Sequence, residues 1–185
     1  MAEERKKYAD SLMASGKSEE EVILEYSKKY GLDSFADQEK AKEFKEKLIA
    51  DAPSDRPMLT INPESKDLGD ISQKDGLTNT LFEIKNEGQK DLVINKLETS
   101  CGCTSASVVY QGKEGPKFTM PGHGQENPTD WQVTIKPGDS AQLKIYYDPT
   151  IHKDLEGSVI REIYVYSNDP IDFERKASIE LNQTK

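Results

Sequence analysis

The chain has 185 residues and a mass of 20.8 kDa, enough for one ordinary domain with a small appendage. Its net charge of −9 and pI near 4.9 argue against nucleic-acid binding, because a phosphate backbone is bound by clustered lysine and arginine. The sequence shows neither a signal peptide nor an apolar run near the ~20 residues of a membrane span. We expect it to be the soluble part of a longer protein whose leader or anchor was removed, so that membrane contact needs a segment outside this chain.

Residues 1–52 are predicted to form a small helical region. Gly16 is expected to end the first helix. Ser18 and Glu21 have the spacing of a capping box, in which each side chain accepts a hydrogen bond from the other residue's backbone. A third helix is expected to start at Ser34. The apolar positions of all three follow helical spacing.

Residues 53–57 are predicted to be a linker, because Pro53 and Pro57 prevent a helix from continuing through them. From 58 to 185 the apolar period changes to two, with turn residues between the runs. The fold class is therefore mainly β, an immunoglobulin-like β-sandwich preceded by the helical region, with a barrel as the weaker alternative. The alternating apolar positions are Leu59, Ile61, Phe82, Ile84, Trp131, Val133, Ile135, Ala141, Leu143, Ile145, Tyr147, Ile163, Val165, Ala177, Ile179 and Leu181.

The segment 111–130 does not follow the strand pattern. It is rich in glycine and proline and is predicted to be a long loop, interrupted by Lys117-Phe-Thr-Met120. Long loops on compact sandwiches often carry function. This loop contains Met120 and His123, which bear on the candidate site.

Several motifs resemble a bacterial domain family of unknown function that is defined by a CGCT motif. The family is immunoglobulin-like, is related to Hydin-type modules, and is usually found in exported or envelope proteins. The resemblance spans about 58–182 and implies an extracytoplasmic location, in the periplasm or cell envelope, and an unidentified envelope protein as partner. The motifs are Asn86-x-Gly88, Leu92-Val-Ile94, Cys101-Gly-Cys-Thr104, Pro137-Gly138, Tyr147-Asp-Pro149 and Ser167-Asn-Asp-Pro170.

The N-terminal helices carry a second resemblance. Gly16-Lys-Ser-Glu-Glu-Glu-Val-Ile23 and Lys29-Tyr-Gly31 are similar to the helical domain of CcmH-type cytochrome c maturation proteins. Those proteins carry a Cys-x-x-Cys before the helices, and this chain has no cysteine there. The thiol-reducing role is therefore not transferred.

Cys101 and Cys103, the two cysteines of the chain, are separated by one glycine. Thiolates are soft ligands that select Cu(I), zinc or an iron–sulfur centre, and two of them need further ligands. Met120 and His123 are expected to complete the site, since the turn that carries them could fold back toward the cysteines. A thioether suits copper better than zinc, so Cu(I) is the expected metal. His152, in an exposed turn, is a spare candidate.

Two other interpretations of the Cys-Gly-Cys sequence stay open. In one, Cys101 and Cys103 form a disulfide within a structural or protein-interaction module, although so small a ring removes little unfolded-state entropy. In the other, they exchange disulfides with a partner. No catalytic triad, phosphate loop or nucleophile elbow is recognisable, so we expect a non-enzymatic protein without catalytic residues.

Overall fold

The computed structural model describes residues 2–123 and 126–185. Met1 and two positions of the predicted loop 111–130 therefore lie outside the described residues. The chain divides into two compact units, Met1–Ala52 and Pro53–Lys185. Among the described residues, no helix is both long and apolar enough to cross a membrane.

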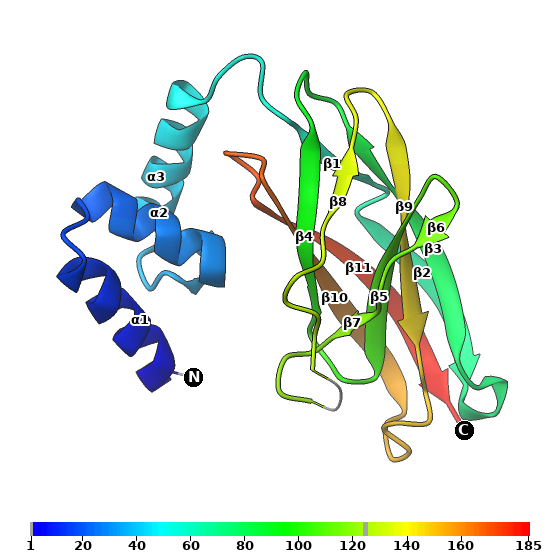
Figure 1. Ribbon diagram of the computed structural model, residues 1–185. Coiled ribbons are helices and arrows are strands. Elements are labelled where there is room, and N and C mark those ends of the chain that lie inside the picture. The colour runs from blue at the N-terminus through cyan, green and yellow to red at the C-terminus, as the bar shows by residue number, and fades with distance from the viewer. Residues whose placement is uncertain (1, 124–125) are drawn as a thin grey trace. The chain divides into compact units, whose positions relative to one another are not determined.

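The first unit is helical (Figure 1). The predicted capping box is confirmed: the backbone N–H of Glu21 donates to Ser18 Oγ at 3.3 Å, and that of Ser18 donates to Glu21 Oε2 at 2.8 Å. Gly16 lies just beyond the first helix with a φ of +76°, a conformation that suits glycine. The elements are α1 (Ala2–Ala14), α2 (Glu19–Tyr30), the 3₁₀ turn η1 (Leu32–Ser34) and α3 (Gln38–Asp51).

The third helix begins later than predicted. Ser34 ends η1, where its hydroxyl donates to the carbonyl oxygen of Gly31 at 2.7 Å. Phe35 has extended backbone angles, which interrupts the helical path. Asp37 is the residue that caps α3, because its carboxylate accepts from the backbone N–H of Lys40 at 3.2 Å.

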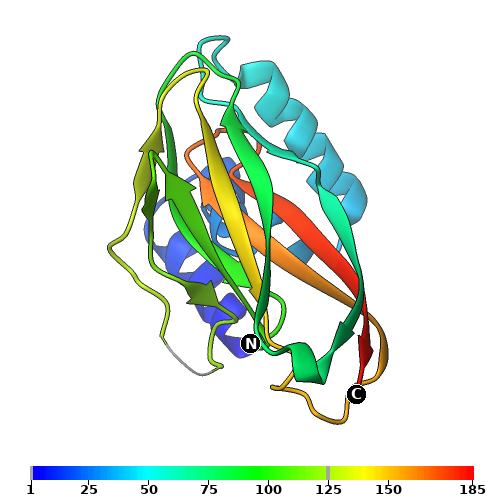
Figure 2. The same cartoon turned by 90° about the vertical axis from the view of Figure 1, so that its right-hand side faces the viewer.

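The second unit is the predicted immunoglobulin-like β-sandwich, so the chain is mainly β with a helical N-terminal region. Figures 1 and 2 show its two sheets as facing layers. Neighbouring strands are antiparallel, except that β2 and β11 are parallel. The first sheet has the order β1 (Leu59–Asn62), β3 (Thr78–Asn86), β9 (Ser140–Tyr147), β5 (Thr104–Tyr110) and β6 (Lys113–Glu114), and β7 (Phe118–Thr119) also pairs with β5. The second has the order β2 (Ser65–Ser72), β11 (Glu174–Thr184), β10 (Gly157–Ser167), β4 (Leu92–Thr99) and β8 (Val133–Ile135), and the 3₁₀ turn η2 (Gln73–Asp75) follows β2.

The core lies between the sheets and is built from the alternating apolar residues. Successive side chains of a strand point to opposite faces, so every second residue enters the core. Fully buried examples from four strands are Ile84, Leu143, Ile163 and Ile179. The period-two pattern thus predicted the buried face of these strands correctly.

The strand predicted to begin at Trp131 is shorter. β8 starts at Val133, and Trp131 lies outside it, partly buried, with its ring centroid 5.2 Å from that of buried Phe118. A Cβ added at Gly115 would come within 2.9 Å of the indole ring. Trp131 therefore packs between the glycine-rich segment and buried Phe118, and it lies before the first residue of β8.

The Asn86-x-Gly88 motif connects separate parts of the sandwich. The carbonyl oxygen of the Asn86 side chain accepts from the backbone N–H groups of Met58 at 3.3 Å and Gly88 at 3.0 Å. Its amide nitrogen donates to the carbonyl oxygen of Ile135 at 3.0 Å. A buried asparagine with these partners fixes the turn after β3.

The Ser167-Asn-Asp-Pro170 motif holds the start of the sandwich. Asp169 is buried and accepts from Arg56 Nη1 at 2.6 Å, from the backbone N–H of Leu59 at 2.9 Å and from that of Ile171 at 3.0 Å. Arg56 belongs to the segment predicted as a linker. The end of that segment is therefore tied to the sandwich by a partly buried ion pair.

Candidate metal centre

The Cys-Gly-Cys segment is the crossing from the second sheet to the first, between β4 and β5. The hydroxyl of Thr99 lies 3.0 Å from the carbonyl oxygen of Cys101 and 2.9 Å from that of Thr104. The backbone N–H of Asp148 donates to the carbonyl oxygen of Cys103 at 2.8 Å. The loop is thus fixed by hydrogen bonds at both of its ends.

A second loop, between β9 and β10, carries His152. The side chain of Gln183 on β11 is buried beneath it. Gln183 Nε2 lies within hydrogen-bonding distance of the carbonyl oxygens of Pro149, His152 and Leu155, at 3.1, 3.1 and 3.0 Å. The hydroxyl of Tyr147 donates to Gln183 Oε1, which fixes the orientation of the amide. One buried side chain therefore organises the backbone on which His152 is carried.

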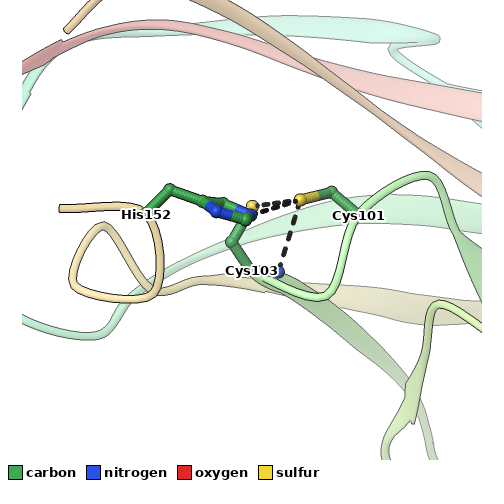
Figure 3. A group of neighbouring side chains, drawn as sticks. All are labelled: Cys101, Cys103 and His152. Carbon is green, nitrogen blue, oxygen red and sulfur yellow. Dashed lines mark hydrogen bonds between the residues drawn. The ribbon is translucent and has the colours of Figure 1, made fainter. Parts of the chain in front are cut away.

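Side chains from the two loops converge (Figure 3). Sγ of Cys101 lies 3.1 Å from Nε2 of His152 and 2.8 Å from Sγ of Cys103. The two sulfur atoms and a ring nitrogen of His152 all lie within 4.8 Å of one another. The two sulfur atoms are not bonded to each other in this structure. Cys103 is 3% exposed, Cys101 is half-buried, and His152 is exposed. The three side chains could hold one metal ion.

Arg161 on β10 borders the buried sulfur. Its Nε donates to Cys103 Sγ at 3.1 Å, and its Nη1 donates to the carbonyl oxygen of Ile160 at 2.9 Å. Burial raises the pKa of the Cys103 thiol, and the hydrogen bond with Cys101 adds to this increase. The guanidinium acts in the opposite direction, because a positive charge favours the thiolate. Arg161 is therefore placed to compensate negative charge on the cysteine pair.

A surface hollow of about 640 Å³ lies beside the cluster. Both His152 and Arg161 line it, and each of them contacts one of the sulfur atoms. Its other lining residues are Ile151, Lys153, Asp154 and Leu155. Neither cysteine lines the hollow, so a ligand in it would meet the cluster through His152 and Arg161.

Of the four residues expected to bind metal, the structure brings together Cys101 and Cys103. His123 is exposed, with its Cβ 3.4 Å from the position a Cβ would take at Gly102, but among the described residues it does not join the group of possible ligands. Met120 is half-buried, and its carbonyl oxygen accepts from the backbone N–H of His123 at 3.2 Å. Its role as a ligand stays a prediction.

The histidine in the cluster is the spare candidate, His152. Sequence reasoning placed it second because the residues around it indicate an exposed turn. It lies 51 positions from Cys101 along the chain. Arg161, 58 positions from Cys103, has no sequence feature that predicts its place at the site. Its place in an alternating strand carried no signal that it would face a thiol.

Comparison with known proteins gives a limited result. The profile of a family described as "Protein of unknown function (DUF1573)" matches residues 59–116. The match includes both cysteines and ends before His152 and Arg161. No curated protein matches the chain.

Solved structures resemble the sandwich. A crystal structure of a protein of unknown function from Porphyromonas gingivalis W83 is 20% identical, with a TM-score of 0.52 over 72% of this chain and 50% of that one. The chain thus spans half the length of the Porphyromonas protein. The ASH / PapD-like domain of human CEP192 (PapD-like domain 7) is 10% identical, with a TM-score of 0.45 over 72% of this chain and 90% of that domain. At this identity the first likeness concerns the fold alone.

Proposed function

We propose that this protein is a non-enzymatic metal-handling module of the cell envelope that binds Cu(I) through Cys101, Cys103 and His152. The observation that carries the proposal is the convergence of two sulfur atoms and an imidazole nitrogen within 4.8 Å. Thiolate and imidazole ligands together suit Cu(I) and zinc, whereas calcium and magnesium prefer oxygen. The two sulfur atoms are 2.8 Å apart, so binding of one ion between them would require the cysteine side chains to rotate apart.

The number of ligands suits Cu(I) without a further donor. Zinc is almost always four-coordinate, and among the described residues the cluster contains three histidine or cysteine ligands and no carboxylate, so zinc would need a fourth ligand from water or a partner. Cu(I) is stable with fewer than four ligands and prefers soft sulfur donors.

The charge at the site favours copper as well. Two thiolates with a monovalent copper ion carry one net negative charge, which the guanidinium of Arg161 at 3.1 Å offsets. The same thiolates with divalent zinc would be neutral and would leave Arg161 without a matching charge in the site.

The exposure of the ligands supports transfer to a partner. His152 is exposed and Cys101 is half-buried, whereas Cys103 is nearly covered. An incoming ligand from another protein could replace His152 first while the sulfur atoms still hold the ion. The envelope location and an envelope partner are part of this proposal, and the resemblance to an exported CGCT-motif family supports them. The relations to Hydin-type modules and to CcmH-type helices stay predictions.

The test is an anaerobic titration of the reduced, metal-free protein with Cu(I) in competition with a chelator. We expect one Cu(I) per chain. Cys101→Ser, Cys103→Ser and His152→Asn should each lower the affinity by more than the roughly 100-fold that loss of an outer partner costs. His123→Ala is the matched control and should bind as the wild type does, and Met120→Leu tests the thioether. A Cu(I) affinity equal to that of the wild type in both cysteine variants would refute the proposal.

The second candidate is a structural or interaction module in which the cysteines form a disulfide. The separation of 2.8 Å between the two sulfur atoms favours it, since little movement is needed to join them. In that case the purified protein would contain no metal, and Cys103→Ser would lower the free energy of unfolding without a change in metal content. Elemental analysis together with a free-thiol count, with and without reductant, separates the two candidates.

A further inference from the structure

The two thiols of the cluster are in contact but differ in exposure. Their sulfur atoms are 2.8 Å apart, and a disulfide bond requires an approach of about 0.8 Å more. Cys101 is half-buried and can be reached from solvent, whereas Cys103 is 3% exposed. An external molecule can therefore form a bond to the sulfur of Cys101. The sulfur of Cys103 can then react only with that of Cys101.

Each thiol also has its own polar partner. Nε2 of His152 lies 3.1 Å from the sulfur of Cys101 and can accept its proton. Nε of Arg161 donates to the sulfur of Cys103 at 3.1 Å and stabilises its thiolate form. Both partners line the hollow of about 640 Å³, so a substrate in it would lie beside the two side chains that contact the sulfur atoms.

From this arrangement we infer that the reduced protein reacts with disulfides, with Cys101 as the attacking thiol and Cys103 as the resolving thiol. The reaction uses the same side chains as the proposed metal site but does not require a metal. Its substrate is a disulfide, either of a small molecule or exposed on another protein.

The reaction has two steps. In the first, Cys101 gives its proton to His152, its sulfur forms a bond to one substrate sulfur, and the other substrate sulfur leaves and takes the proton from His152. In the second, the sulfur of Cys103 attacks that of Cys101. The Cys101–Cys103 bond forms, and the second substrate thiolate leaves with the proton that Cys103 gives up. Two electrons pass from the cysteine pair to the substrate disulfide.

The consequence for metal binding is direct. A disulfide uses both sulfur atoms that would bind Cu(I), so the oxidised protein cannot hold the ion in this site. Metal and disulfide would therefore exclude each other, and the supply of disulfides would regulate metal release.

The test uses reduced, metal-free protein mixed with oxidised glutathione, quenched with a thiol-blocking reagent and analysed by mass. Wild-type protein should lose two hydrogens and release two glutathione molecules per chain. Cys103→Ser and Cys103→Ala should stop at a mixed disulfide on Cys101. Cys101→Ser should form an adduct on Cys103 at least about tenfold more slowly, because that sulfur is buried.

Further variants test the roles of the neighbours. His152→Gln should slow the first step, whereas His123→Ala, the matched control, should leave it unchanged. A disulfide-linked peptide serves as a second probe. Reaction with either probe supports the proposal, and the faster one identifies the source of the disulfide.

The proposal is overturned if Cys101 and Cys103 form adducts at equal rates, or if the wild-type adduct never closes to the internal disulfide. A parallel Cu(I) titration keeps this result separate from the metal function. Failure to bind Cu(I) would end the metal proposal and leave the exchange reaction standing, and the reverse also holds.

Discussion

The amide nitrogen of Gln183 lies 3.1 Å from the backbone carbonyl oxygen of His152. Through this contact the last strand of the sandwich positions the loop that brings a histidine to the cysteines. The side chain of Gln183 is buried, and its oxygen accepts from Tyr147, so its orientation is fixed. The rigidity of the candidate site thus depends on a residue that does not touch the sulfur atoms.

Replacing Gln183 with leucine should loosen this loop. Three backbone carbonyl groups would lose their partner, so we expect the free energy of unfolding to fall by about 1–3 kcal/mol. The affinity for Cu(I) should fall about 10- to 100-fold, as for other outer partners of metal ligands. Urea denaturation and chelator competition measure the two effects. Asn182→Leu on the same strand, which removes an exposed hydrogen bond to Asp70, is the control and should retain the affinity. An unchanged affinity in Gln183→Leu would show that the loop positions His152 without this contact.

Arg161→Gln should change metal preference more than stability. Without the guanidinium, the negative charge of two thiolates with Cu(I) is no longer offset, whereas a zinc site with the same thiolates is neutral. We expect the Cu(I) affinity to fall by about tenfold and the zinc affinity to change less. Parallel competition titrations with the two ions give the ratio. Arg161→Lys, which keeps the charge, should recover part of the Cu(I) affinity. A proportional loss for both ions in Arg161→Gln would argue against a charge effect.

Two glycines of the motifs should respond differently to alanine. A Cβ at Gly88 would lie 2.2 Å from the carbonyl oxygen of Arg56, so the backbone has to move, and we expect a loss of roughly 1–3 kcal/mol in unfolding free energy. At Gly102 the nearest atom is the Cβ of His123 at 3.4 Å, and the φ angle is not positive. Gly102→Ala should therefore stay within about 0.5 kcal/mol of wild type and keep its thiol chemistry. Urea denaturation of both variants is the measurement. Similar losses in the two would mean that the glycine between the cysteines has a steric role that the geometry does not show.

A low pH should lower the free energy of unfolding, because it protonates Glu114 on β6 of the first sheet. The hydrogen bond from Tyr146, supported by one from Ser107 at 2.7 Å and by Lys144 at 3.3 Å, lowers the pKa of this carboxyl to about 2. Because the folded pKa lies below the ordinary value of 4.5, the carboxylate contributes stability that is complete above pH 4.5 and is lost as the pH falls toward 2. Urea denaturation from pH 6 to pH 2.5 should show the advantage of wild type over Glu114→Gln shrinking across this range. A constant difference between the two proteins would contradict this assignment.

Local patterns were sufficient for much of the fold. The period-two runs predicted which residues of β3, β9, β10 and β11 enter the core, because a strand alternates its faces whatever its partner is. The capping box at Ser18 and Glu21 was predicted because its partners are three residues apart. The start of α3 was predicted wrongly because Ser34 and Asp37 are both good capping residues. The extended backbone at Phe35 places the start of the helix after Asp37.

For the candidate site, the sequence by itself determined that two thiols lie together, because one glycine separates them along the chain. The tertiary structure alone decided that His152 rather than His123 joins them, and that Arg161 lies beside the buried sulfur. These partners are 51 and 58 positions away from the cysteines they meet. Such contacts depend on how the two sheets pack and on the register of β10. A local pattern of residues does not determine which side chains so far apart along the chain come into contact.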